Sequence, residues 1–134
     1  MNETQTSTSR TTRKKRPGFA PLVSLINEAL LEKKAENVRV LDVRKLTTLT
    51  DYFIVCQGGS DTQIRALANN VTEKIKEQTG EHVWRKEGLD NKKWVVLDYV
   101  DVVVHIFNEE TRNFYALEKM WNDAEITDIR DEKS

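Results

Sequence analysis

Apolar side chains recur along the chain with two different periods, so the sequence predicts helices as well as strands. A helical spacing starts behind Pro21, a residue suited to a first helical turn, and we expect this helix to end at Asn37. A second helix is expected from Ser60, which forms a capping-box pattern with Gln63, to Gly80 as a C-terminal cap. The apolar positions of the two stripes are Leu22, Leu25, Ile26, Ala29 and Leu30, and then Ile64, Leu67, Ala68, Val71 and Ile75.

Shorter apolar runs between these helices have the composition of strands. One short strand is expected from Val38 to Val43, and the almost continuously apolar run from Asp51 to Gln57 is typical of a strand in the middle of a sheet. A last helix should begin at Asn108, with Phe114, Leu117 and Trp121 on one face. The three remaining strands are predicted at His82–Lys86, Lys93–Asp98 and Asp101–Phe107. This order predicts a single α/β domain, a five-stranded mixed sheet flanked by helices.

The last two strands are separated only by Tyr99 and Val100, so the sequence predicts a hairpin with these two residues as its turn. Asp98 would then lie opposite Asp101, and the side chains would alternate between two faces. One face is aliphatic, and we expect it to pack in the core: Val95, Leu97, Val102, Val104 and Ile106. The other face is mixed, and it carries Trp94, Val96, Asp98, Asp101, Val103 and His105.

The mixed face leaves several interpretations open. Two carboxylates directly across a hairpin repel each other, so Asp98 and Asp101 require either solvation near the turn or a cationic partner. Trp94 has the character of an interface anchor, but it would equally suit a partly covered sheet face. For His105 a structural role is favoured over catalysis or metal binding, because no nucleophile motif accompanies it and the only other histidine is His82.

Charge divides the chain into unlike parts. Residues 1–18 hold five basic side chains against Glu3, a net charge of +4, so the remainder of a chain with −1 overall carries −5. We expect residues 1–18 to be a disordered basic arm, or alternatively an organellar targeting peptide. The domain proper should span 19–124, followed by an acidic tail at 125–134. An acidic domain is poorly suited to gripping duplex nucleic acid and suits a basic protein partner instead.

The single cysteine, Cys56, excludes a disulfide within the chain and a cysteine-rich zinc site. We expect it to be a small buried thiol in a reducing compartment. No apolar run reaches the roughly 18 residues of a membrane span, so no membrane association is expected. The sequence thus favours a cytoplasmic protein, or a mitochondrial or plastid one if residues 1–18 are a targeting peptide.

Several separated motifs resemble the ribosomal silencing factor family (RsfS, also called the Iojap family). They are DYFIVCQGGS from Asp51 to Ser60, the Glu87-Gly88 step, WVVLDYVDVVVHIF from Trp94 to Phe107 and ETRNFYALEKMW from Glu110 to Trp121. The resemblance covers most of the chain, from about Leu22 to Ala124. One position departs from it, because the family usually has glycine where this chain has Val100. If that position requires a positive φ, a β-branched residue is costly there, and the two-residue turn and its register are in doubt.

The resemblance implies a small α/β fold related to the nucleotidyltransferase superfamily. No cofactor is expected, and no metal either, because a metal site needs more ligands than this chain offers in one place. It also implies binding to the large ribosomal subunit through ribosomal protein L-fourteen, where the protein would sterically block the small subunit and repress translation. Within the family's binding patch, the tryptophan and the apolar tip residue match Trp94 and Tyr99. The pairing argued above adds Asp98, Asp101, Val103 and His105 to this predicted site.

Two rival functions follow from other features. A nucleotidyltransferase would use Gly59-Ser60 to hold phosphate at a helix start, but it also needs two carboxylates on the next strand for its metal ions. The acids after Ser60 lie in a helical pattern instead, so the chain is not expected to be an enzyme: Asp61, Glu73 and Glu77. An RNA-binding ribosome assembly factor rests only on the basic arm, which could contact ribosomal RNA without sequence preference. A homodimer that uses the same surface also stays open.

Overall fold

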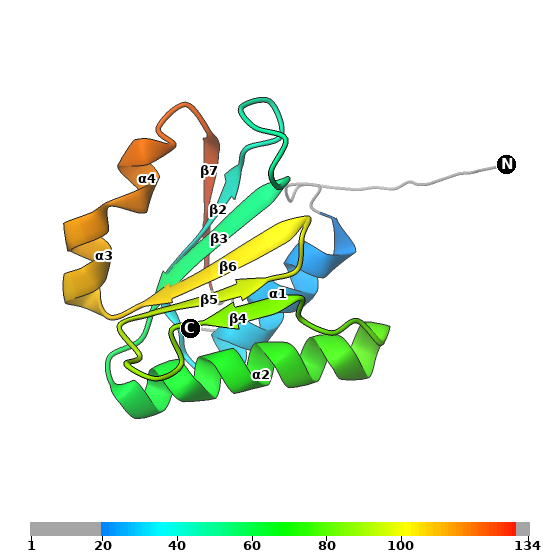
Figure 1. Cartoon of the computed structure of the whole chain (residues 1–134), viewed down its shortest axis with the longest axis vertical. Helices are drawn as coiled ribbons and strands as arrows, with labels where there is room; N and C mark the ends of the chain where they lie inside the picture. The colour runs from blue at the N-terminus through cyan, green and yellow to red at the C-terminus, as the bar shows by residue number, and fades with distance from the viewer. Residues whose placement is uncertain (1–19, 131–134) are drawn as a thin grey trace, which may run out of the picture.

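The computed structural model describes residues 20–130, so the predicted basic arm lies outside the described residues. Within them the helices are α1 (Pro21–Glu32), α2 (Asp61–Thr79), α3 (Glu109–Tyr115) and α4 (Leu117–Met120). The strands are β2 (Glu36–Asp42), β3 (Tyr52–Gln57), β4 (Arg85–Glu87), β5 (Trp94–Asp98), β6 (Val102–Phe107) and β7 (Glu125–Ile129). The predicted single α/β domain with a mixed sheet is confirmed (Figure 1).

The sheet has six strands in the order β4-β5-β6-β3-β2-β7, so the expected count of five is wrong. Its central pair, β3 and β6, is parallel, and every other pair among the described strands is antiparallel. The additional strand is β7, which comes from residues that the sequence assigned to an acidic tail and which pairs with β2 along its length. The apolar pattern did not predict this strand, because an exposed edge strand needs few apolar side chains.

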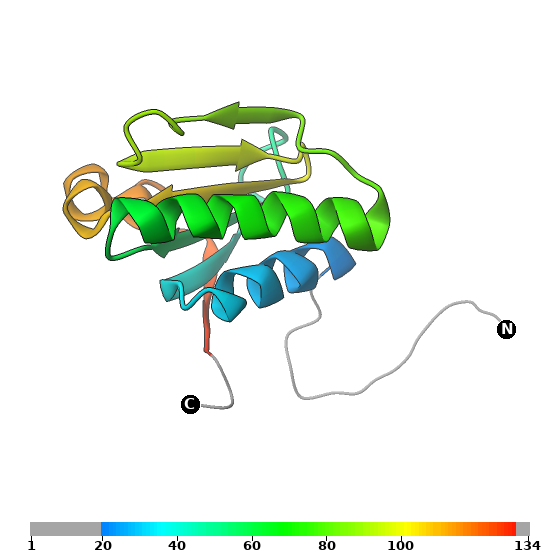
Figure 2. The same ribbon diagram turned by 90° about the horizontal axis from the view of Figure 1, so that it is seen from below.

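Two helices cover one face of the sheet. Figure 2 shows α1 and α2 side by side along it. Their buried stripes, with Ile26, Leu30, Leu67 and Val71 among them, meet the aliphatic side chains of the strands in the main core. All five residues of the predicted aliphatic hairpin face are buried in this core: Val95, Leu97, Val102, Val104 and Ile106. That part of the sequence prediction is confirmed.

The opposite face holds a second, smaller core. Buried Leu41, Val55 and Phe107 pack there beneath Leu117 of α4. Figure 1 shows α3 and α4 at the left of the sheet, away from the turn that joins β5 to β6. The short helices therefore cover only part of this face.

Several predicted element boundaries are wrong. The first helix ends at Glu32 rather than at Asn37, which instead lies inside β2 with φ of 50° where the β2–β3 register shifts. The expected last helix is divided at Ala116, whose φ of 49° ends α3. Trp121 is therefore the C-terminal cap of α4, outside any continuous stripe. The strand predicted at 82–86 is only Arg85–Glu87.

The predicted hairpin register is also wrong, by two residues. Asp98 lies opposite Val103, not Asp101, and Trp94 lies opposite Phe107. The backbone N–H of Tyr99 donates to the carbonyl oxygen of Val102 at 2.9 Å, so the turn residues are Val100 and Asp101. Because side chains alternate with a period of two, a shift of two residues leaves every side chain on its predicted face.

Candidate partner-binding site

The hairpin turn is built around a strained residue. Val100 has φ of 76°, and the N–H of Asp101 donates across it to the carbonyl oxygen of Tyr99 at 2.9 Å. This is a γ-turn of the positive-φ kind, which is rare for a β-branched side chain. Asp98 stabilises the turn because its Oδ1 accepts a hydrogen bond from the Val100 N–H at 2.7 Å. The doubt that the sequence attached to Val100 was therefore justified.

The two carboxylates of the hairpin do not face each other across the strands. Asp98 caps the turn, while Asp101 is an exposed turn residue. The carbonyl oxygen of Asp101 accepts hydrogen bonds from the N–H groups of Asp51 and Tyr52, at 3.0 and 3.2 Å. These bonds join the turn to the start of β3, so the tip is held in place from the neighbouring strand.

Tyr99 does not lie exposed at the tip as the sequence predicted. Its side chain is 5% exposed and packs in the main core beneath the sheet. Burial raises the pKa of the Tyr99 phenol to about 12. The exposed apolar side chain at the tip is Val100, at 55%. The error arose because the sequence assigned Tyr99 to the turn, whereas it continues the strand pairing and points inward in alternation with Val95 and Leu97.

Trp94 and His105 are joined on the mixed face. The indole Nε1–H of Trp94 donates to Nδ1 of His105 at 3.0 Å. Trp94 is half-buried and stacks on Phe107, with ring centroids 5.0 Å apart. His105 is 7% exposed, and burial lowers its pKa to about 4, so the imidazole is neutral at pH 7. This pair, which is adjacent on the predicted face, is brought into direct contact.

Two further aromatic residues extend this surface, and the sequence interpretation missed both. Phe53 lies 5.3 Å from His105 and 5.3 Å from Trp121, between ring centroids. Phe53, Trp94 and Trp121 are each half-buried. We call these three residues, with His105, the aromatic strip. Strand alternation places Phe53 opposite Val103 on β6 and so could have identified it, but only if the parallel pairing had been known.

The hairpin part of this face ends at the edge strand. Val96, Asp98 and Val103 are half-exposed beside the aromatic strip. Across β5, Glu87 pairs with Val96 and Arg85 with Asp98, which puts two of the three charged residues of β4 on the same face. The six residues predicted from the sequence therefore separate into a surface group, a buried His105 and a Tyr99 that packs on the other side of the sheet.

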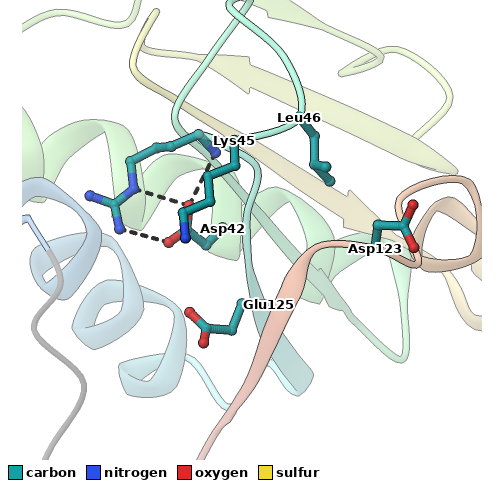
Figure 3. Close-up of a pocket in the computed structure, with 6 residues that line it drawn as sticks. Asp42, Lys45, Leu46, Asp123 and Glu125 are labelled. Atoms are coloured by element: carbon teal, nitrogen blue, oxygen red, sulfur yellow. Dashed lines mark hydrogen bonds and ion pairs between the residues drawn. The ribbon is translucent and has the colours of Figure 1, made fainter.

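A pocket of about 650 Å³ lies elsewhere, at the end of β2 and β7 (Figure 3). Arg44 forms an ion pair with Asp42 at 2.7 Å, and this hydrogen-bonded partner holds the pKa of Asp42 below its usual range. Figure 3 shows Lys45 overlapping Asp42 in this view, with Glu125 below them and Asp123 to the right. Acidic and basic side chains therefore both line the pocket. Among residues 20–130, no three His, Cys, Asp or Glu side chains gather where they could hold a metal ion.

The Gly59-Ser60 segment is a helix cap. Ser60 Oγ accepts from the Gln63 N–H at 3.1 Å, and Gln63 Oε1 accepts from the Gly59 N–H at 2.6 Å, which confirms the predicted cap. Gln63 Nε2 also donates to the carbonyl oxygens of Lys33 and Lys34. The Gly59 N–H and the Ser60 hydroxyl, which a bound phosphate would need, are therefore engaged in the cap. Gln63 also joins α2 to the end of α1.

Fold and site together define a class of protein. The chain is a small α/β domain whose distinguishing surface is a half-exposed aromatic strip beside carboxylates, a composition typical of protein recognition. None of the helices within residues 20–130 is long and apolar enough to cross a membrane.

Residues 17–134 match the sequence model of the family described as ribosomal silencing factor during starvation, and the chain belongs to that family. The resemblance stated from the motifs is thereby confirmed. The family's name describes a regulatory factor of translation rather than an enzyme.

Individual relatives agree with this assignment. The chain is 40% identical over 98 residues to the ribosomal silencing factor RsfS of Bacillus subtilis, covering 73% of this chain and 82% of that protein. A solved structure of a Chromobacterium violaceum protein has a TM-score of 0.73 and 38% identity, over 75% of this chain and 83% of that one. A more distant mouse relative, 28% identical over 102 residues, is named mitochondrial assembly of ribosomal large subunit protein 1; the match spans 74% of this chain and 44% of it.

Proposed function

We propose that the protein binds the large ribosomal subunit through ribosomal protein L-fourteen and sterically prevents the small subunit from docking, thereby repressing translation. The observation that carries this proposal is the aromatic strip, in which Trp94 is tied to His105 on a face that the short helices leave partly open. Half-buried aromatic side chains held by rigid strands are the usual anchors of protein interfaces.

Charge supports a basic partner. Ribosomal proteins are typically basic, whereas residues 19–134 of this chain carry −5. Asp101 is exposed at the hairpin turn, and Asp98 lies half-exposed on the same face as the aromatic strip. Carboxylates at the rim of an interface steer association with a cationic surface. The name of the mouse relative, which refers to the large subunit, favours that subunit as the place of binding.

The proposed contact residues differ from the sequence prediction in their roles. Trp94, Asp98, Asp101 and Val103 stay in the proposed site as surface residues. Tyr99 instead supports the tip from within the core, and we assign the apolar contact at the tip to Val100. Phe53 and Trp121 extend the proposed patch through the aromatic strip.

We further propose that the fold is a nucleotidyltransferase-like one without catalytic function. The three acids that follow Ser60 lie on α2: Asp61, Glu73 and Glu77. The next described strand, β4, carries a single carboxylate, Glu87, in place of the pair that the metal ions would need. Metal-dependent nucleotide incorporation by the purified protein would overturn this. We also propose the bacterial cytoplasm as its compartment, because the relatives of highest identity described above are bacterial.

Binding to isolated large subunits tests the proposal. We expect Trp94→Ala to weaken binding, measured by co-sedimentation, by about 2 kcal/mol or roughly thirtyfold in affinity, because it removes the central anchor. Trp84→Ala is the matched control, since Trp84 is 62% exposed and stacks with Arg85 outside the aromatic strip. Thermal unfolding must show that both variants are folded. Equal co-sedimentation of Trp94→Ala and wild type would contradict the assignment.

Two additional arms separate the partners. Chemical cross-linking of the bound protein should identify L-fourteen among the large-subunit proteins. Deletion of residues 1–18 should leave most binding intact, because the proposed surface lies in the folded domain. Loss of binding on that deletion would favour RNA capture by the basic arm instead. A homodimer on the same surface would show as competition between self-association and subunit binding.

A further inference from the structure

His105 occupies the centre of the aromatic strip but offers almost no surface to a partner. Its ring lies 5.3 Å from Phe53, 5.9 Å from Trp94 and 6.2 Å from Phe107, between centroids. The residue is 7% exposed. A side chain this deeply buried contributes little contact area, so any effect on binding must be transmitted through its neighbours.

The hydrogen bond between the two rings has only one chemical direction. An indole Nε1–H can donate but cannot accept, so Nδ1 of His105 must present its lone pair at 3.0 Å. In the neutral ring the proton is then on Nε2, which finds no hydrogen-bond partner among the described residues. The low pKa of His105, caused by burial, agrees with a ring that stays neutral. A protonated ring would place two donors face to face.

The indole is thereby restrained in two directions. Its face stacks on Phe107, with centroids 5.0 Å apart and an interplanar angle of 26°. Its N–H edge is bound to His105. Stacking alone lets a ring slide and rotate in its plane, whereas the hydrogen bond fixes which edge points inward. An anchor that is already fixed loses less conformational entropy when a partner binds.

We propose that His105 is a positioning residue that holds the Trp94 indole in its binding orientation and touches no partner atom itself. This inference rests on the proposed function, in which Trp94 is the anchor. It assigns His105 a role that differs from direct contact, and also from general support of the fold, because its effect is expected to pass through one side chain.

A matched pair of variants isolates the hydrogen bond. Asn and Leu are nearly isosteric and both remove the imidazole ring, but only Asn keeps an acceptor near the position of Nδ1. We expect His105→Leu to weaken large-subunit binding by up to about tenfold, the usual worth of one hydrogen bond. His105→Asn should recover most of that loss. His105→Asn should be the less stable of the two, because its amide N–H groups are buried without a partner, so recovery of binding in that variant cannot come from a more stable fold.

Two readouts separate positioning from structural support. The indole N–H resonance of Trp94 in ¹H–¹⁵N spectra, assigned with Trp94→Phe, should shift in His105→Leu and return towards its wild-type position in His105→Asn. In a Trp94→Ala background, His105→Leu should cause no further loss of binding, because the two residues act as one unit. If His105→Leu does not fold, His105→Phe removes the same acceptor while keeping a buried aromatic ring, and it should weaken binding by a similar factor.

Each outcome decides the matter. Additive losses in the double variant would overturn the proposal, because His105 would then act independently of Trp94. A displaced Trp94 resonance with unchanged binding would overturn it as well. If Trp94→Ala itself binds like the wild type, the proposed contact site fails, and that result is recognisable because it concerns Trp94 alone. Loss in His105→Leu, recovery in His105→Asn and no additivity would together establish positioning.

Discussion

At the scale of single residues, the hairpin turn combines a strained backbone with an exposed apolar side chain. Val100 holds φ of 76° although its side chain is β-branched, and Asp98 bonds its N–H to keep the turn closed. A glycine at this position would meet no steric penalty. The chain therefore keeps an exposed apolar side chain at the tip in exchange for backbone strain, which agrees with a contact role for that side chain.

Replacing Val100 should reveal this strain. We expect Val100→Gly to raise the free energy of unfolding by about 1 kcal/mol, because relief of the positive-φ conformation exceeds the added flexibility of the unfolded chain. Val100→Ala is the control, since it also removes the exposed isopropyl group but retains Cβ and should gain less. Chemical denaturation measures both. A Val100→Ala variant as stable as Val100→Gly would show that Cβ is not the source of strain.

Stability should also depend on pH through His105. Burial lowers its pKa from 6.5 to about 4, so the unfolded chain binds a proton more readily than the folded one between these values. The stability is fully present above pH 6.5 and falls as the pH drops towards 4, by up to roughly 3 kcal/mol. Denaturation curves across this range test the prediction. His105→Asn should remove this part of the slope, and an unchanged slope in that variant would refute it.

At the scale of secondary structure, β7 shows how an element can be real without being visible in the sequence. It pairs with β2 from Val38↔Ile129 to Asp42↔Glu125, and Arg39 Nε donates to Asp128 at 2.8 Å. Ile129 packs against the main core. Backbone hydrogen bonds and one ion pair, rather than an apolar stripe, hold the strand in place.

Truncation should measure what β7 contributes. A chain that ends at Ala124 loses the whole strand and exposes the edge of β2, and we expect it to be less stable by about 2 kcal/mol or more. A chain that ends at Arg130 keeps the strand and serves as the control, with stability close to the full-length protein. Thermal unfolding compares the two. Equal stability of both truncations would mean that β7 adds nothing to the fold.

The helices and central strands could be predicted because their apolar periods are strong. The stripes of α1 and α2, and the aliphatic hairpin face, all lie in the main core as expected. The errors lie where backbone conformation overrides the pattern. Asn37, Val100 and Ala116 all have positive φ, and at each of them an expected boundary or register was misplaced. Local periodicity does not report such conformations.

At the scale of the whole molecule, the site could be predicted only in part, because it is assembled from strands distant in the sequence. The hairpin supplied Trp94 and His105, which are adjacent in the predicted register. Phe53 joins them through the parallel pairing of β3 with β6, and Trp121 through the chain beyond α4. No local pattern predicts a contact between residues that far apart in the sequence. Phe53 and Trp121, half of the aromatic strip, were therefore missed.

The position of β7 has a consequence for how the protein is made. It is the last element in the described chain, yet its only neighbour among the described strands is β2, the first of them. During synthesis β2 therefore presents an open edge until β7 has left the exit tunnel. Completion of this side of the sheet must wait until the segments between the two strands have all been made. A protein proposed to act on large subunits would thus close its own sheet only late in its passage through one.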